Sequence, residues 1–187
     1  EHELHVERRL EQILLEPVMD NLHGYEIYLL LLAVWLHDTG KIVNPDDFTE
    51  HHKRVLQFIE KNRNKLNLNN KEAAFIADIC SYHTGSMKIC AVEDYVEVNG
   101  RKVRKRLLTA LLRFANFSSS SYVFPRLHKT SFINTDMPLS IRELWLRHNI
   151  LKKVDIKHER KTVSLEVGLH ESLIESNKLW VKDILDK

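Results

Sequence analysis

The chain has 187 residues, which is enough for one domain or for one domain with a small appendage. Hydrophobic residues make up 43% and charged residues 29%, the usual balance of a globular protein. The formal net charge of +2 gives no argument for nucleic acid, and the apolar runs are far shorter than the roughly 20 residues of a membrane span. We therefore expect neither nucleic acid nor a membrane as a partner.

The cysteines and the start of the chain indicate its setting. Cys80 and Cys90 are the only cysteines and form no C-x-x-C pair, so we expect a reduced, cytoplasmic environment. No signal peptide is visible, and a start at Glu1 suggests that the chain is processed or truncated, which leaves open further domains in the full-length protein.

The first half of the chain predicts four helices, because only five glycines and four prolines interrupt the whole sequence. The first covers residues 1–17 and has one apolar face. The second, from about residue 25 to 38, is apolar almost all round and should be the buried central helix, ended by Gly40. The third lies in residues 44–61, begins near Pro45, and places these residues on one face: Phe48, His52, Val55, Leu56 and Ile59. The fourth covers residues 71–83.

The second half mixes helices with two stretches of alternating pattern. Residues 94–106 alternate on either side of Asn99-Gly100, which predicts a hairpin with a tight turn. Residues 106–117 return to a helix, and residues 152–167 predict a second hairpin.

Two further helices are predicted near the C-terminus. Ser140 and Glu143 form a capping box ahead of a short helix, and an amphipathic helix is expected from about residue 171 to 185. The prediction is a mainly α protein, with a helical bundle over residues 1–130 and a helix, hairpin and helix packed on it over residues 131–187.

Residues 29–41, LLLLAVWLHDTGK, lead an apolar helix directly into His37 and Asp38. Buried charges are usually paired or bound to a metal, because an unpaired buried charge is costly. Either this pair sits at a helix end that reaches water, or a cation binds it.

Other predicted helices carry histidines that could join this pair. His5 lies in the first helix and His83 closes the fourth. His52 lies on the apolar side of the third helix, and His51 is turned roughly 100° away from it. Each histidine alone is most simply a hydrogen-bonded structural residue. Together they form the kind of set with which helical bundles bind divalent metals.

These residues resemble the HD superfamily of metal-dependent phosphohydrolases, through H-x(31)-HDTGK, then a helix with His52, then SYHTG. The resemblance covers His5 to about Tyr122, and the stretch after it is similar to longer members such as the HD-CE group. It implies an HD-domain helical bundle with two small β hairpins, the second in a C-terminal α/β tail. By position it implies these metal ligands: His5, His37, Asp38, His52, His83 and Asn116. His2, one turn before His5, is a rival for the first position, but HVERRL fits the family's H-x-x-R phrasing better.

One position departs from the family pattern. Members read approximately L-L-R-L-A-D-x-L-D where this chain has LLRFANFSS, so the last aspartate ligand falls on Asn116 and a second acid on Ser119. With one divalent ion, neutral histidines and Asp38, the cluster keeps one positive charge that an aspartate would cancel. We expect weaker metal retention. The sequence leaves open whether activity is lost or whether the asparagine is an engineered change that traps a complex.

The implied cofactor is one or two divalent transition-metal ions (Mn, Fe, Zn, Co or Ni), which a mixed imidazole and carboxylate set suits. Such an ion would lower the pKa of a bound water and polarise a phosphoryl oxygen. The predicted function is hydrolysis of a nucleotide or related phosphoester, with Asp38 and Lys41 as catalytic residues. The alternative is a catalytically degraded HD module that binds a nucleotide or a partner as a sensor or regulatory domain.

Other basic residues are candidates for substrate binding. Lys41 could hold a phosphate or could compensate a helix dipole. Arg126 and His128 are candidates from their proximity in sequence alone. The basic run at residues 101–106 is either a solvated face or a polyphosphate contact, and Tyr95 is the only aromatic residue nearby, so nucleic acid is an unlikely partner.

Overall fold

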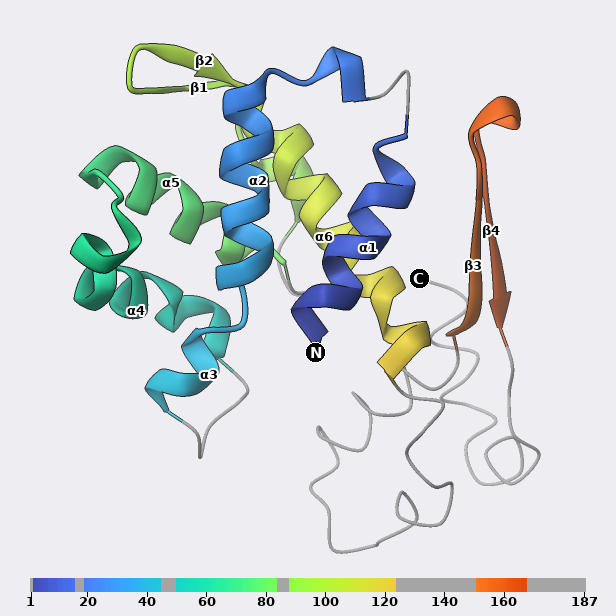
Figure 1. Ribbon diagram of the computed structural model, residues 1–187, viewed down its shortest axis with the longest axis horizontal. Coiled ribbons are helices and arrows are strands. Elements are labelled where there is room, and N and C mark those ends of the chain that lie inside the picture. Colours follow the sequence, from blue (N-terminus) through green and yellow to red (C-terminus); the bar gives the residue numbers. More distant parts are fainter. Residues whose placement is uncertain (1, 16–18, 45–49, 84–87, 124–150, 168–187) are drawn as a thin grey trace, which may run out of the picture. The chain divides into compact units, whose positions relative to one another are not determined.

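The structure is a computed structural model that describes residues 2–15, 19–44, 50–83, 88–123 and 151–167 (Figure 1). The chain divides into two compact units, residues 1–119 and 120–187, and each is considered by itself. The predicted domain boundary after residue 130 lies outside the described residues.

The first unit is a helical bundle with one small hairpin. Its elements are α1 (His2–Ile13), α2 (Gly24–Leu36), α3 (Gly40–Val43), α4 (His51–Leu66), α5 (Asn70–Ser81), β1 (Val96–Val98), β2 (Arg101–Val103) and α6 (Lys105–Val123), which continues past the unit boundary. Short 3₁₀ helices cover Met19–Asn21 and Ile89–Ala91. The predicted mainly α fold with two small hairpins is confirmed.

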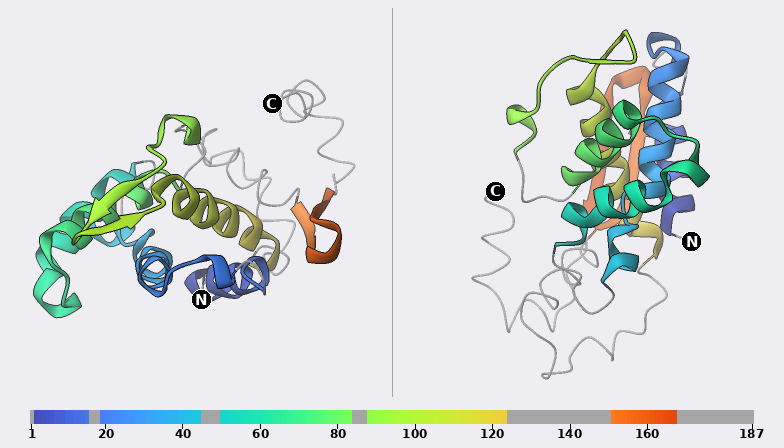
Figure 2. Two further views of the ribbon diagram at one scale, coloured as in Figure 1. Left: turned by 90° about the horizontal axis from the view of Figure 1, so that it is seen from above. Right: turned by 90° about the vertical axis from the view of Figure 1, so that its left-hand side faces the viewer.

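One apolar core holds the bundle together. Helix α1 packs on α2, α2 on α5, α5 on α4, and α4 on α3, while α6 runs alongside α1 and α2 (Figures 1 and 2). The core side chains with an exposed fraction of 0–2% include Val6, Leu10, Leu29, Leu30, Val55, Ile59, Ile76, Ile79, Leu108 and Leu112. Burial of each such side chain stabilises the fold by roughly 1.5–3 kcal/mol relative to exposure.

Helix α2 is central, but it is not buried all round, although its apolar composition predicted that it would be. Tyr28, Leu31 and Trp35 are 40%, 36% and 47% exposed. These residues are three or four positions apart and so lie on one face of the helix. Within the described part of the chain, the neighbouring helices cover only the other faces of α2.

The region after α2 also differs from the prediction. Gly40 begins the short helix α3 instead of ending α2, and α4 begins at His51. Phe48, predicted on the apolar face of the third helix, lies outside the described residues. Leu56, predicted on the same face, is 41% exposed, whereas His52, Val55 and Ile59 are buried.

The first hairpin is confirmed, with Val96 opposite Val103 and Val98 opposite Arg101. Asn99 and Gly100 both have positive φ angles, 53° and 74°, as a two-residue type I′ turn requires. Val98 and Val103 are buried in the core, which fixes the register of the hairpin against the bundle.

The second unit contains the second predicted hairpin, β3 (Leu151–Lys157) and β4 (Thr162–Val167), which is confirmed. The strands are antiparallel, with Val154 opposite Leu165. A 3₁₀ turn at His158–Arg160 connects them. The predicted helices near residues 143–148 and 171–185 lie outside the described residues.

None of the helices in the described residues is long and apolar enough to cross a membrane.

Candidate metal centre

Asp38 is the meeting point of two groups of possible metal ligands. One group is His2, His37 and Asp38, and the other is Asp38, His51 and His83. Within each group the ligand atoms lie within 4.8 Å of one another. These side chains come from the start of α1, the end of α2, the start of α4 and the end of α5, so the cluster forms at one end of the bundle.

The two oxygens of Asp38 face different histidines. Oδ1 lies 3.1 Å from Nε2 of His51 and 3.6 Å from Nε2 of His83. Oδ2 lies 3.8 Å from Nε2 of His2 and 3.7 Å from Nε2 of His37. A carboxylate placed in this way could bind one ion through either oxygen, or two ions with one oxygen each.

The imidazole orientations suit a metal. Nδ1 of His37 lies 2.7 Å from the carbonyl oxygen of Val34, and Nδ1 of His83 lies 2.6 Å from that of Cys80. Each Nδ1–H can therefore donate to a backbone carbonyl, which leaves Nε2 with its lone pair directed at the cluster. This is the usual outer hydrogen bond of a metal-binding histidine.

Two observations test whether these residues fit a divalent ion. Nε2 of His37 is buried and has no hydrogen-bond partner among the described residues, although buried polar atoms normally have one. On the other side, Nε2 of His51, Nε2 of His83 and Oδ1 of Asp38 lie 3.0–3.6 Å apart. Because ligand distances to such ions are roughly 2.0–2.2 Å, all three atoms can contact one ion. The residues fit.

The electrostatics of the cluster favour the forms of its groups that bind a metal, namely the ionised carboxylate and the neutral imidazole. Burial alone would raise the pKa of Asp38, but the hydrogen bond from His51 and the charges of His37 and Lys41 hold it well below its ordinary value. Burial, together with the neighbouring His37, lowers the pKa of His83 to about 3. Burial also lowers the pKa of His2. At neutral pH the carboxylate is therefore ionised, and these two imidazoles are neutral.

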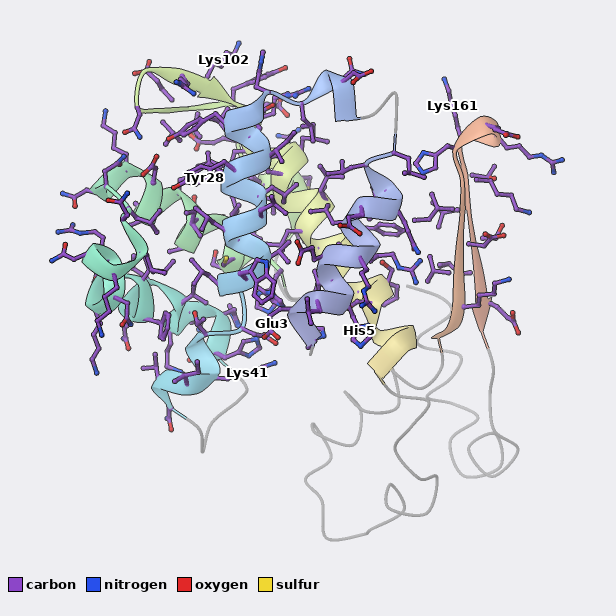
Figure 3. The ribbon with its side chains drawn as sticks, viewed as in Figure 1. Glu3, His5, Tyr28, Lys41, Lys102 and Lys161 are labelled. Carbon is purple, nitrogen blue, oxygen red and sulfur yellow. The ribbon has the colours of Figure 1, made fainter. Side chains whose placement is uncertain are left out.

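The first histidine of the cluster differs from the sequence-based expectation. The structure places His2, the rival candidate, beside Asp38, while His5 belongs to neither group. His5 lies three residues further along α1, about 60° around the helix and nearly one turn away from His2. In Figure 3, His5 lies toward α6, whereas Lys41 is part of α3.

The third helix also contributes a different histidine. His51 joins Asp38 and His83, whereas the expected His52 belongs to neither group. The His52 ring is buried, with its centroid 5.9 Å from that of His51 and 6.4 Å from that of His83. The apolar face of α4 correctly placed His52 in the core. The cluster, however, lies at the end of the bundle, and the side chain that reaches it is that of the neighbouring residue His51, at the start of α4.

Asn116, which the family resemblance placed among the ligands, contacts the cluster through His2. Its Oδ1 is 3.0 Å from Nε2 of His2. Ser119, which replaces a second acid of the family pattern, is buried and donates its hydroxyl to the carbonyl oxygen of Asn116 at 2.8 Å. Asp38 is therefore the one carboxylate in the two ligand groups of the described residues.

Lys41 contacts the cluster directly. Its Nζ lies 2.5 Å from Oδ2 of Asp38, and the side chain is 39% exposed. The ammonium thus occupies the same oxygen that faces His2 and His37. Arg126 and His128, the other candidates for substrate binding, lie outside the described residues.

The cations at residues 101–106 have structural partners. Arg101 lies over the ring of Tyr25 and Lys102 over that of Tyr95, at 4.7 Å and 4.1 Å from the centroids. Arg104, Lys105 and Arg106 form ion pairs with Glu26, Asp78 and Asp94, respectively. These contacts support the interpretation of this run as a structural and solvated face.

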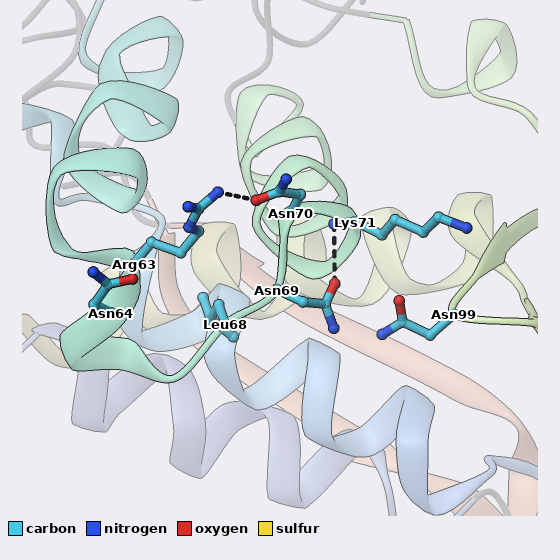
Figure 4. A pocket seen from close by; sticks show the side chains of 7 residues that line it. All are labelled: Arg63, Asn64, Leu68, Asn69, Asn70, Lys71 and Asn99. Carbon is cyan, nitrogen blue, oxygen red and sulfur yellow. Dashed lines mark hydrogen bonds between the residues drawn. The ribbon is translucent and has the colours of Figure 1, made fainter.

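A surface cavity of about 560 Å³ lies away from the cluster, where α4 meets α5 (Figure 4). It is lined by Arg63, Asn64, Leu68, Asn69, Asn70, Lys71 and Asn99. None of these residues is a carboxylate or a histidine, so the cavity offers no set of metal ligands.

A helical bundle with an HD pair and imidazoles from neighbouring helices around one aspartate is the arrangement of an HD-type domain. The family model described as HD-CE matches residues 1–172, and the chain therefore belongs to the HD-CE family. HD-type domains are generally metal-dependent phosphohydrolases. Comparisons with curated proteins and with solved structures give no match.

Proposed function

We propose that this protein is a metal-dependent phosphohydrolase that acts on a nucleotide or a related phosphoester. The observation that carries the proposal is the convergence of two histidine groups on the two oxygens of Asp38. Family membership supports the reaction class. The nucleotide is the ligand class we favour within it.

The proposed cofactor is one or two divalent transition-metal ions, for which imidazole and carboxylate ligands are suited. The residues that would hold it are His2, His37, Asp38, His51, His83 and, as a neutral oxygen donor, Asn116. When bound, such an ion activates water as a nucleophile and polarises the phosphoryl group.

The chain's own residues have separate tasks in this proposal. Asp38 supplies the negative charge of the site and connects its two sides. The carbonyl oxygens of Val34 and Cys80 fix the rings of His37 and His83. Lys41, which is partly exposed, can exchange Asp38 for a phosphate oxygen and so position the substrate.

Phosphate release with and without the Asp38 charge tests the proposal. The purified chain is supplied with Mn²⁺ and a panel of nucleoside mono-, di- and triphosphates and simple phosphoesters. Turnover of a panel member by the wild type, abolished in Asp38→Asn, is the expected result. Asp94→Asn removes a carboxylate from an exposed position that pairs with Arg106, and it should leave turnover unchanged. Equal phosphate release by the wild type and Asp38→Asn would refute the proposal.

A second candidate function, a nucleotide-binding module without hydrolysis, is favoured by two observations. Asn116 brings no charge to the cluster, and the Lys41 ammonium already neutralises Asp38. In this case the wild type would bind a nucleotide in a calorimetric titration but release no phosphate from it.

A further inference from the structure

Gly40 lies against the backbone of the first residue of α4. A Cβ atom added at Gly40 would lie 1.8 Å from the carbonyl oxygen of His51, 2.7 Å from its carbonyl carbon and 3.3 Å from its Cα. All three are backbone atoms, which cannot rotate away as a flexible side chain can. Only a residue without a Cβ allows α3 and α4 to approach so closely.

Backbone conformation does not explain this glycine. Gly100 is the glycine with a positive φ angle in the described residues, and Gly40 begins a right-handed helix that other residues could adopt. The requirement at Gly40 is space alone. Gly24 offers a comparison, because it also begins a helix and an added Cβ there would meet nothing within 4 Å.

The α4 side of the contact is the side that would yield to an added Cβ. The segment that joins α2 to α3, residues 37–39, is fixed to α2 by two hydrogen bonds. The backbone N–H and the hydroxyl of Thr39 donate to the carbonyl of Leu36, at 3.1 Å and 2.7 Å. His51 is the first residue of its helix, and the first turn of a helix lacks intrahelical partners for its N–H groups. Since carbon atoms normally pack at about 3.5 Å, a shift on the order of 1–2 Å is required.

We propose that Gly40 is a positioning residue. Because it has no Cβ, the backbone of α4 can approach closely enough to keep the His51 ring against Asp38 and His83. Nε2 of His51 makes contacts of 3.1 Å with Asp38 and 3.0 Å with His83, and a shift of the first turn of α4 breaks both. The side of the cluster with His2 and His37 does not involve α4. The effect of Gly40 is therefore specific to one side of the cluster. The metal-binding part of this inference rests on the proposed function.

The first test uses the protein without metal. The rings of His51 and His83 have centroids 5.0 Å apart, so nuclear Overhauser contacts between them should be visible in protein with labelled histidines, assigned with His51→Gln. We expect these contacts in the wild type and in Gly24→Ala, and their loss in Gly40→Ala. Retention in a folded Gly40→Ala protein would overturn the proposal, whether or not the protein hydrolyses any substrate.

The second test asks whether Gly40 acts through His51. Equilibrium dialysis measures Mn²⁺ binding by the wild type, Gly40→Ala, His51→Ala, the double variant and Gly24→Ala. We expect roughly 10- to 100-fold weaker binding in Gly40→Ala, the effect of removing a supporting contact of a metal ligand. The loss in His51→Ala should be at least as large, because that variant removes the ligand itself. The double variant should be no weaker than His51→Ala, because residues that act through one contact are not additive.

The outcomes separate the two proposals. Additive losses, or wild-type binding by Gly40→Ala, would overturn the positioning role. A Gly40→Ala protein that fails to fold while Gly24→Ala folds would also overturn it, because Gly40 would then support the whole bundle. A wild type that binds no Mn²⁺ would refute the metal-dependent function, and the ring contacts in the metal-free protein would still decide the role of Gly40.

Discussion

Nε2 of His2 lies 3.0 Å from Oδ1 of Asn116, although the two residues are 114 positions apart in the chain. The contact places the middle of α6 at the start of α1, beside Asp38. The amide at position 116 is thus close enough to the cluster for its lack of charge to affect cation binding.

Asn116→Asp should strengthen Mn²⁺ binding by at least roughly tenfold. At 4 Å, two unit charges attract by about 4 kcal/mol at an effective dielectric constant of 20, and part of this gain is offset by burial of the new carboxylate. Equilibrium dialysis measures the change. Asn64→Asp, at an exposed position on α4, is the control and should bind as the wild type does. Weaker binding by Asn116→Asp would contradict the placement of residue 116 at the cation.

The same variant separates the two candidate functions. If the wild type releases no phosphate and Asn116→Asp gains both metal and turnover, the chain is a binding module that has lost hydrolysis. Turnover by the wild type itself excludes that second function.

His2→Ala and His5→Ala should differ in metal binding. His2 belongs to a ligand group with Asp38, and His5 does not. His2→Ala should therefore weaken Mn²⁺ binding at least as much as the loss of a supporting contact does, by roughly tenfold or more, while His5→Ala leaves it nearly unchanged. Thermal unfolding of both metal-free variants controls for damage to α1. Weaker Mn²⁺ binding by His5→Ala than by His2→Ala would contradict this assignment and restore His5 as the first ligand.

Lys41→Met should change metal binding and turnover in opposite directions. Removal of the ammonium frees Oδ2 of Asp38 from a contact at 2.5 Å, so Mn²⁺ binding should become stronger. Phosphate release should fall, because the cation that positions the substrate is lost. Binding is measured by dialysis and turnover by phosphate release at saturating Mn²⁺. If turnover stays constant, Lys41 has no part in substrate binding.

The buried Glu26 should make the stability of the bundle depend on pH. Burial opposes ionisation of Glu26, but its hydrogen bonds from the Arg104 side chain and from the backbone of Arg104 and His23 lower its pKa from 4.5 to about 2. A lowered pKa contributes stability above pH 4.5 that is lost as the pH falls toward 2. The full contribution is up to about 3 kcal/mol.

Urea unfolding of the wild type and Glu26→Gln at several pH values tests this contribution. The stability difference between the two proteins should be largest near pH 7 and should narrow below pH 4.5. A difference that is constant down to pH 3 would show that the Glu26 charge does not contribute.

The helices and hairpins could be predicted from local patterns, because each pattern depends only on the residues of the segment that forms the element. Asn99-Gly100 specifies a tight turn wherever it lies, and the turn formed as predicted. The exposed face of α2 could not be predicted in this way. A helix that is apolar all round indicates burial, but the extent of its cover depends on helices distant in sequence.

The cluster shows the same limit within single helices. The sequence indicated which helices carry a histidine toward Asp38, but His2 and His51 replace the expected His5 and His52 in the ligand groups. Apolar periodicity reports which face of a helix meets the core. It does not report where along the helix a site at the end of the bundle lies, and the contact of Gly40 with the His51 backbone has no local signature at all.

The central claim is that the imidazoles around Asp38 bind a cation, and metal content tests it most directly. The chain and Asp38→Asn are purified without oxygen, reconstituted with Mn²⁺ or Fe²⁺, passed through a desalting column and analysed by elemental mass spectrometry. We predict one to two equivalents of metal per wild-type chain and a large loss in Asp38→Asn. A wild type that retains no metal, or an Asp38→Asn protein that retains as much as the wild type, would contradict the account.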